Sequence, residues 1–272
     1  MSYKIIASDL DGTLLNSKSE LSAENAEAIR LLFERGVHFV PATGRSFAEI
    51  PTAIKDSPYI RYYIHSGGAA IYDKKTDTRT RFCLSAELSK KIFEVLCKYD
   101  CHITVRMNGA TYSDSALAEK AFLDYYNVWK VHSDILFASG IFLENFRDAL
   151  KSAENVEMIT LFFHDDSDRY PIIEKVGALG GVNFAQACPY NLEITSDTAD
   201  KGTALLALAE SLGVSPSRVI ALGDSGNDSA MIKAAGLGLA VSNSMPELLK
   251  IADSMVCSSD EHALKYVLKK YF

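Results

Sequence analysis

Apolar, β-rich runs alternate with segments of helical periodicity near both ends of this chain, and this alternation constrains the fold more than any other feature. The first part predicts strands at 3–9 and 37–43, with helices at 21–36 and 45–56. The last third repeats the pattern, with strands expected at 191–195, 217–224 and 237–242 and helices at 200–212, 227–236 and 245–253. Such alternation predicts a parallel sheet that is covered by helices on both faces.

The middle of the chain, from about Phe82 to Cys188, has a different character. It contains helical and β-rich stretches, but none of its strands ends in a polar cluster of the kind found outside it. We interpret it as an inserted α+β domain with its own sheet. The predicted division is a parallel-sheet core made of residues 1–82 and 189–272, with the inserted domain at 83–188.

Charge and cysteine content exclude several classes of partner. The net charge of −7 and the isoelectric point near 5.4 argue against a nucleic-acid or anionic-membrane surface. The chain has neither a signal-peptide pattern nor an apolar run long enough to span a bilayer. Five cysteines without a C-x-x-C pair indicate reduced thiols and a cytoplasmic location. No pattern in the sequence predicts an oligomeric state.

Polar side chains follow the predicted core strands at the points where these strands end. In an open parallel sheet, ligands bind in the crevice beyond the carboxyl ends of the strands, so groups at these ends converge there. The groups in this chain are Asp9 and Asp11; Thr43, Gly44 and Arg45; Lys201; and Asp224, Asn227 and Asp228.

The residue types in these clusters indicate phosphoryl transfer. Carboxylates such as Asp9 and Asp224 supply the hard oxygens that suit Mg²⁺, which is usually bound by a few carboxylates and substrate phosphate. Thr43, Lys201 and Asn227 form a cradle for an anion together with backbone N–H groups. One carboxylate can act as nucleophile, and a second carboxylate two residues away can act as general acid and base. The site predicts hydrolysis of a small-molecule phosphate ester.

The clusters lie in four motifs, and the chain resembles the haloacid dehalogenase superfamily, specifically its Cof-type phosphatases with a type IIB cap. The motifs are "DLDGTLL", "ATGR", Lys201 in "DKGTAL", and "GDSGNDSAM". The tail "GLGLAVSNSMPELLKIAD" is also similar to Cof-type members. The resemblance implies an α/β fold, with a Rossmann-like parallel-sheet core and an inserted α+β cap. It further implies Mg²⁺-dependent hydrolysis of small phosphorylated metabolites, often sugar phosphates.

The resemblance also assigns roles to four acidic residues. Asp9 would be the nucleophile, forming an aspartyl-phosphate, and also a metal ligand. Asp11 would be the general acid and base, and its backbone carbonyl would bind the metal. Asp224 would be a direct metal ligand. Asp228 would bind the metal through a water molecule or would contact the residues that bind it directly.

Five residues would hold the phosphate by the same resemblance. Thr43, Lys201 and Asn227 would contribute their side chains, and Gly44 and Leu10 would contribute backbone N–H groups.

Two positions depart from the pattern of the family. Gly67-Gly68 stands where members often carry Asn-Gly, and His262 stands where glycine is usual.

Two other functions remain open. A phosphomutase of the same superfamily would share the catalytic residues, and a catalytically silent binding protein would keep the fold. Substrate contacts are expected from the cap, with these candidates: Arg106, Asn108, Tyr112 and His164.

Overall fold

The computed structural model describes residues 2–186 and 188–272, so Met1, the first residue of the predicted core, lies outside the described residues, as does Ala187. The chain divides into two compact units. Unit 1 comprises Met1–Gly44, Ile50–Thr80 and Asp200–Phe272, and unit 2 comprises Arg45–Glu49 and Arg81–Ala199. No helix in the described part of the chain is long and apolar enough to cross a membrane. The division at 82/83 and 188/189 into catalytic core and cap stays a prediction.

Unit 1 is built on a five-stranded parallel sheet with the order β14-β13-β12-β1-β2. The central strand β1 is buried over its whole length, and its parallel partners come from opposite ends of the chain. This confirms the predicted parallel sheet. The strands are β1 (Ile5–Ser8), β2 (His38–Pro41), β12 (Val219–Gly223), β13 (Leu237–Val241) and β14 (Ser254–Val256).

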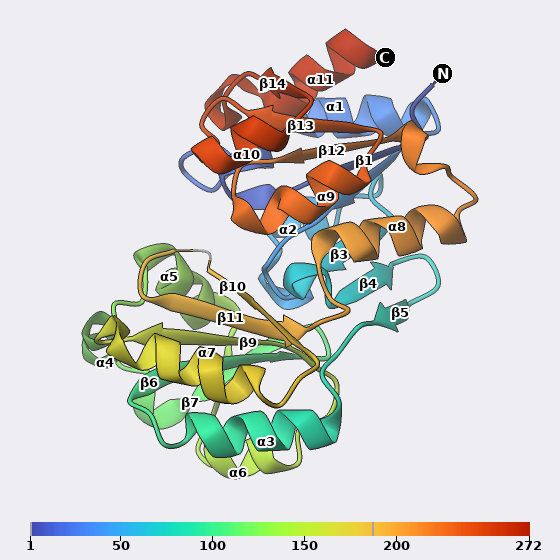
Figure 1. The fold of residues 1–272 in the computed structure, drawn as a ribbon. Coiled ribbons are helices and arrows are strands. Elements are labelled where there is room, and N and C mark those ends of the chain that lie inside the picture. Colours follow the sequence, from blue (N-terminus) through green and yellow to red (C-terminus); the bar gives the residue numbers. More distant parts are fainter. Residues whose placement is uncertain (1, 187) are drawn as a thin grey trace. The chain divides into compact units, whose positions relative to one another are not determined.

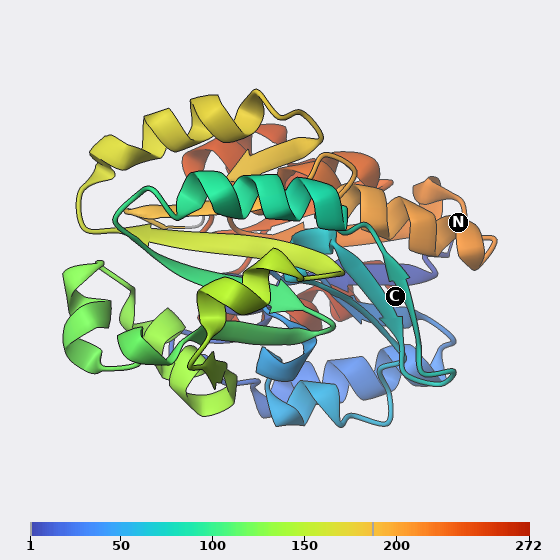
Figure 2. The same cartoon turned by 90° about the horizontal axis from the view of Figure 1, so that it is seen from below.

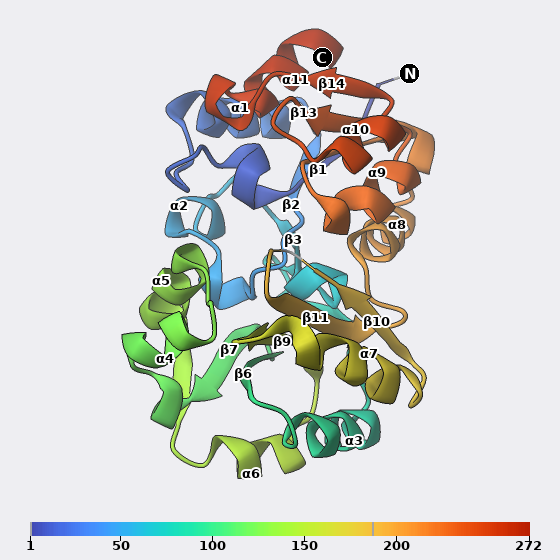
Figure 3. The same ribbon diagram turned by 60° about the vertical axis from the view of Figure 1, so that its left-hand side comes forward.

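Helices cover both faces of this sheet (Figures 1 and 3), with α1 and α11 on one face and α8, α9 and α10 on the other. In α1, the Ser22 hydroxyl caps the N-terminus by accepting the Asn25 N–H, and one apolar side of the helix is buried against the sheet. The helices are α1 (Ala23–Glu34), α8 (Lys201–Ser211), α9 (Ser229–Ala234), α10 (Pro246–Ile251) and α11 (Ala263–Tyr271).

A small three-stranded sheet, which was not predicted from the sequence, is formed by residues 62–81. It has the order β3 (Tyr62–His65), β4 (Ala70–Asp73) and β5 (Thr78–Arg81). The predicted helix at 45–56 is wrong as a single element. It is split into a helical turn at Phe47–Glu49 and the short α2 (Thr52–Lys55), because Pro51 disfavours helical geometry at the residue before it.

Unit 2 contains a six-stranded sheet with the order β10-β11-β9-β6-β7-β8. All of its neighbouring strands run antiparallel except the β7–β8 pair. The strands are β6 (Cys101–Met107), β7 (Ala110–Asp114), β8 (Ile141–Leu143), β9 (Val156–Phe163), β10 (Val182–Ala185) and β11 (Asn191–Ser196).

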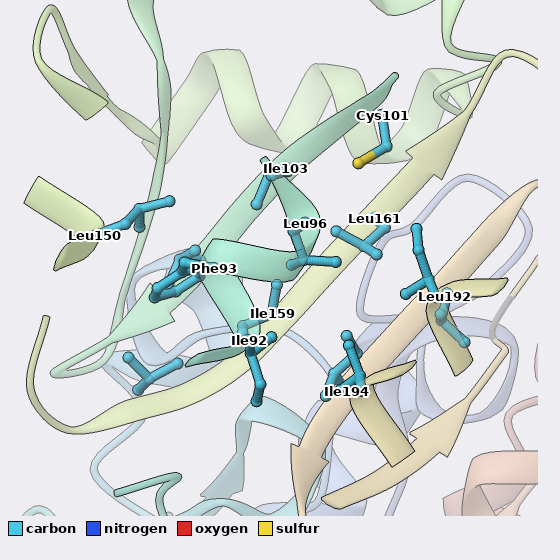
Figure 4. Packing of buried hydrophobic residues seen from close by; sticks show 14 of the residues in the cluster. Ile92, Phe93, Leu96, Cys101, Ile103, Leu150, Ile159, Leu161, Leu192 and Ile194 are labelled. Carbon is cyan, nitrogen blue, oxygen red and sulfur yellow. The ribbon is translucent and has the colours of Figure 1, made fainter. Parts of the chain in front are cut away.

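One face of this sheet forms the main hydrophobic core of unit 2. Helices α3 and α7 lie side by side across it (Figure 2). Ile92 and Leu96 of α3 point toward Ile159 and Leu161 of β9 (Figure 4), and all four side chains are buried. The helices of the unit are α3 (Ala86–Leu96), α4 (Lys120–Tyr125), α5 (Lys130–Ser139), α6 (Phe146–Lys151) and α7 (Arg169–Gly177).

Strand β11 corrects one prediction. The segment 191–195 was expected in the parallel sheet, but it pairs antiparallel with β9 and β10 in unit 2. The physical reason is its burial: Leu192 and Ile194 join the apolar core, while Asn191 and Glu193 on the alternate positions are also buried. A strand buried on both faces has the same sequence pattern in either type of sheet.

Candidate active site

Asp9 lies directly beyond the carboxyl end of β1. Its backbone N–H donates to the Leu222 carbonyl of β12 at 2.9 Å, which extends the pairing of the two strands to this residue. The chain then turns at Leu10–Leu14, where Gly12 has a φ of +77°. A Cβ at Gly12 would lie 2.8 Å from Asp224 Oδ2, so the turn can approach this carboxylate closely only with glycine.

Lys201 connects Asp9 with Asp228. It opens α8, as predicted, and only 1% of its surface is exposed. Its Nζ donates at 2.7 Å to Asp9 Oδ1 and at 2.7 Å to Asp228 Oδ1. Burial alone would lower the pKa of Lys201, but the two carboxylates raise it above its usual value, so the ammonium stays charged.

Asp228 is fully buried and is held from both sides. Its Oδ2 accepts the backbone N–H groups of Asp224 and Ser225, each at 3.0 Å, while Oδ1 accepts from Lys201. Asp228 thus fixes both the lysine and the loop that carries Asp224.

Asp224 completes a group of carboxylates. Its Oδ1 accepts the Thr13 hydroxyl at 2.8 Å. Oxygen atoms of Asp9, Asp224 and Asp228 all lie within 4.8 Å of one another. Burial raises the pKa of Asp224 to about 6, with the Asp228 charge as the second cause.

The chemistry of this group fits a divalent cation. Burial raises the pKa of Asp9 well above its usual value, and the charges of Asp228, Asp224 and Asp11 add to this effect against the opposing charge of Lys201. Three carboxyl groups thus share one ammonium, so ionising all three in this largely buried place leaves an excess of negative charge that is costly without a further cation. A hard cation such as Mg²⁺ would compensate that excess, and Asp9 and Asp224 offer oxygens for it.

The other predicted residues lie around the same edge of the sheet. Asn227 Oδ1 is 3.4 Å from Lys201 Nζ and accepts the Ser225 hydroxyl at 3.0 Å. Leu10 is buried in the turn after Asp9, and Asp11, in the same turn, is half-buried. The carboxylate group of Asp9, Asp224 and Asp228 does not include the Asp11 side chain.

Thr43 and Gly44 follow β2, the neighbour of β1 in the sheet. The Ala42 N–H donates to the Ser8 carbonyl at 2.8 Å, which brings this segment alongside the end of β1. Thr43 is buried, and its backbone is fixed by two hydrogen bonds to the segment 64–67. An added Cβ at Gly44 would meet no atom within 4 Å.

Two residues of the site were not predicted. Thr13 binds Asp224, and the Asn243 amide donates to the Gly12 carbonyl at 2.8 Å while its oxygen accepts the Ser259 N–H. The signal for Asn243 was present, because Asn243 follows β13 in the same way that Asp224 follows β12.

Residues 6–268 match the family of haloacid dehalogenase-like hydrolases. The chain belongs to this family. It is therefore a hydrolase. The predicted fold class, an α/β protein with a Rossmann-like parallel-sheet core and an inserted α+β domain, is confirmed.

Individual relatives cover almost the whole chain. The chain is 27% identical to the phosphatase YwpJ of Bacillus subtilis (strain 168), with 98% of this chain and 99% of that protein covered. It is 28% identical to the 5-amino-6-(5-phospho-D-ribitylamino)uracil phosphatase YcsE of the same organism, with 98% and 95% covered. A solved haloacid dehalogenase-like hydrolase from B. subtilis has a TM-score of 0.84 and 26% identity, with 99% and 100% covered.

Proposed function

We propose that the protein is a Mg²⁺-dependent phosphatase that hydrolyses small phosphorylated metabolites, with sugar phosphates as the expected class. The observation that carries the proposal is the buried network in which Lys201 binds Asp9 and Asp228 beside Asp224. Its excess of negative charge suits a cation, and the cation and lysine together suit a phosphate. The names of the relatives support the reaction, and one of them is named for a phosphorylated ribityl compound.

The proposed first step is a transfer of the phosphoryl group to Asp9. The Asp9 carboxylate attacks phosphorus, the bond to the leaving oxygen breaks, and Asp11 gives that oxygen its proton. Lys201 holds the Asp9 carboxylate in place through the 2.7 Å contact. When bound, Mg²⁺ supplies positive charge that offsets the negative charge of the phosphoryl group.

In the second step, water hydrolyses the aspartyl-phosphate. Asp11, now ionised, accepts a proton from the water as its oxygen attacks phosphorus, and Asp9 is released as a carboxylate. We assign Thr43, Asn227 and the backbone of Leu10 and Gly44, together with Lys201, to binding the non-reacting phosphoryl oxygens. In this assignment Asp224 is a direct metal ligand, and Asp228 acts by positioning Asp224 and Lys201.

Unit 2 is proposed to be the cap that selects the leaving group. Of the four candidates for substrate contact, Tyr112 packs on the apolar face of the sheet and Arg106 is buried in contacts of its own unit. His164 is exposed and stacks on Tyr125, and Asn108 is in a turn with a φ of 52°. A cytoplasmic location stays a prediction.

The Asp9→Asn variant tests the mechanism. It keeps the size of the side chain but removes the nucleophile, so release of inorganic phosphate should fall by about 10³-fold or more. The measurement is phosphate release from a panel of sugar phosphates, nucleotides and other phosphorylated metabolites, with and without Mg²⁺. Asp56→Asn, at an exposed aspartate beyond α2, is the matched control and should keep full activity.

The same assay separates the alternatives. A phosphomutase would yield an isomerised sugar phosphate rather than free phosphate, which ³¹P NMR distinguishes. A silent binding protein would bind a phosphorylated compound without turnover. Phosphate release by Asp9→Asn at the wild-type rate would exclude the proposed mechanism.

A further inference from the structure

The loop at residues 242–245 contacts both turns that carry proposed metal ligands. It directly follows β13, the parallel neighbour of β12, so it lies at the same edge of the sheet as the carboxylate group. The loop and the two turns all belong to unit 1. Their contacts therefore lie within one compact unit.

One part of the loop binds the backbone that presents Asp224. The Met245 N–H donates to the Asp224 carbonyl at 2.8 Å, and the Ser244 hydroxyl donates to the Gly223 carbonyl at 3.2 Å. Ser244 is buried. These two bonds connect the loop to the end of β12 and to the residue that follows it.

Asn243, in the same loop, binds the other turn. Its side-chain amide donates to the Gly12 carbonyl at 2.8 Å. The backbone angles of Asp11 (φ −75°, ψ 123°) and Gly12 (φ 77°, ψ −2°) are those of a type II turn. Because Gly12 directly follows Asp11, a bond that orients the Gly12 carbonyl restricts the backbone that carries the Asp11 side chain and carbonyl.

The Asn243 amide is itself held in one orientation. Its Oδ1 accepts the Ser259 N–H at 3.0 Å. A backbone N–H can only donate and a carbonyl can only accept, so these two partners determine which end of the amide faces each of them. The segment that contains Ser259 is fixed in turn, because the Glu261 carboxylate accepts the Ser258 N–H at 3.0 Å and the Asp260 carboxylate accepts the Ser17 N–H at 2.8 Å.

Other hydrogen bonds of the turn end at different groups. Two N–H groups at its end donate to the carbonyls of Asp9 and Leu10, and the Thr13 hydroxyl donates to Asp224. None of these bonds ends at the Gly12 carbonyl, which is the group that Asn243 binds. Asn243 thus adds a restraint at the tip of the turn.

We propose that Asn243 is a positioning residue for the metal site. Through the loop 242–245, it fixes the turn that carries Asp11 against the residue Asp224. This inference rests on the proposed function, in which Asp9, Asp11 and Asp224 hold Mg²⁺. Asn243 need not touch the metal, because loss of a partner that orients metal ligands typically lowers metal affinity or activity by about 10-fold to 100-fold.

The Asn243→Ala variant tests the inference. In isothermal titration calorimetry, the dissociation constant of Mg²⁺ should rise by about 10-fold or more. With p-nitrophenyl phosphate as substrate at a fixed Mg²⁺ concentration, kcat/KM should fall by about 10-fold to 100-fold. Asn243 is exposed, so the variant should fold, and its melting temperature without metal should change by less than about 4 °C.

The Asn243→Asp variant separates the two bonds of the amide. Its carboxylate can still accept the Ser259 N–H, but it cannot donate to the Gly12 carbonyl. If the bond to Gly12 is the one that matters, kcat/KM should fall at least as far as in Asn243→Ala. Wild-type kcat/KM in Asn243→Asp would show that this bond is dispensable and would overturn the inference.

Asn183→Ala is the matched control. Asn183 is also exposed, and its side-chain amide also donates to a backbone carbonyl, that of Asp197 at 3.3 Å, within unit 2. This variant should keep both the dissociation constant of Mg²⁺ and kcat/KM.

The outcomes separate the inference from the proposed function. If the wild type binds Mg²⁺ and releases phosphate, and Asn243→Ala keeps both values, Asn243 is merely structural and the inference is wrong while the proposed function stands. If the wild type releases no phosphate from any ester, the proposed function fails. The Mg²⁺ affinities of the wild type and Asn243→Ala then still decide the inference: equal values, or no binding by either protein, overturn it.

Discussion

At the scale of single residues, His102 shows how unit 2 can make stability depend on pH. It lies on β6, is fully buried, and its Nε2 is 3.4 Å from the Ser113 hydroxyl. Within the described residues, no hydrogen-bond partner reaches its Nδ1. Burial lowers the pKa of His102 from 6.5 to about 4, while the Asp114 charge acts in the opposite direction. The ring is therefore neutral in the folded protein at neutral pH.

We predict that this histidine destabilises the protein in acid. Between pH 6.5 and 4 the unfolded chain binds a proton at His102 that the folded chain does not, so stability is complete above the unfolded pKa and falls as the pH decreases. The loss approaches about 3 kcal/mol near pH 4. The measurement is urea unfolding at several pH values. His102→Leu should remove this part of the pH dependence, whereas the exposed His164→Leu should keep it; equal slopes in all three proteins would contradict the prediction.

The proximity of single residues at the site could be predicted, but their pairing could not. Asp9 and Asp224 each follow a strand of one parallel sheet, and this rule alone brings them to one edge. The sequence does not reveal that Lys201 spans Asp9 and Asp228, or that Thr13 binds Asp224, because such pairings depend on side-chain directions within turns. His262 illustrates the same limit: it adopts the left-handed conformation, with a φ of 63°, that glycine would adopt there.

At the scale of elements, the turn between β3 and β4 packs closely against the start of α8. Gly68 in this turn has a φ of +99°, and a Cβ there would lie 2.2 Å from the backbone carbon of Asp200. Asp200 is the N-cap of α8, and its side chain accepts the N–H groups of Gly202 and Thr203. The turn thus packs tightly against the residue that directly precedes Lys201.

We predict that Gly68→Ala destabilises unit 1 much more than Gly213→Ala does. Both glycines have positive φ, but an added Cβ at Gly213, with a φ of +64°, would meet no atom within 4 Å. Gly213→Ala should cost about 1 kcal/mol, from the backbone conformation alone. Gly68→Ala adds a clash with backbone atoms and should cost more than about 2 kcal/mol. Chemical denaturation measures both, and similar losses would show that the approach to Asp200 is not tight.

Helices and strands were predictable where their apolar periodicity was strong. They were harder to predict where contacts with residues distant in the sequence determine their place in the fold. Helix α1 lies within the predicted helix at 21–36, because its apolar periodicity and its capping residue, Ser22, both lie within that segment. Strand β11 was identified as a strand but assigned to the wrong sheet, since its partner β9 lies far away in the sequence. The helical turn Phe47–Glu49 is similar, because it packs in unit 2, where Glu49 pairs with Arg106, a residue distant in the chain.

At the scale of the whole molecule, the chain forms two units with separate cores. Unit 1 is assembled from three sequence segments around the parallel sheet, and it contains all of the residues that are proposed to bind the metal and the phosphate. Unit 2 has its own apolar core between α3, α7 and the six-stranded sheet. Units with separate cores often unfold in separate steps. A ligand that binds one unit stabilises only that unit directly.

We therefore predict that Mg²⁺ raises the melting temperature of one calorimetric transition and leaves the other nearly unchanged. At a hundredfold excess over its dissociation constant, a ligand adds about 2.7 kcal/mol to the unit that binds it, which corresponds to roughly 5–10 °C in Tm. Hydrogen exchange across the transition identifies that unit, and amides of β1 and β12 should gain protection while those of β9 do not. Asp224→Asn removes a proposed ligand and should abolish the shift, whereas Asp56→Asn should keep it. An equal shift of both transitions, or a shift that survives in Asp224→Asn, would contradict metal binding at the carboxylate group of unit 1.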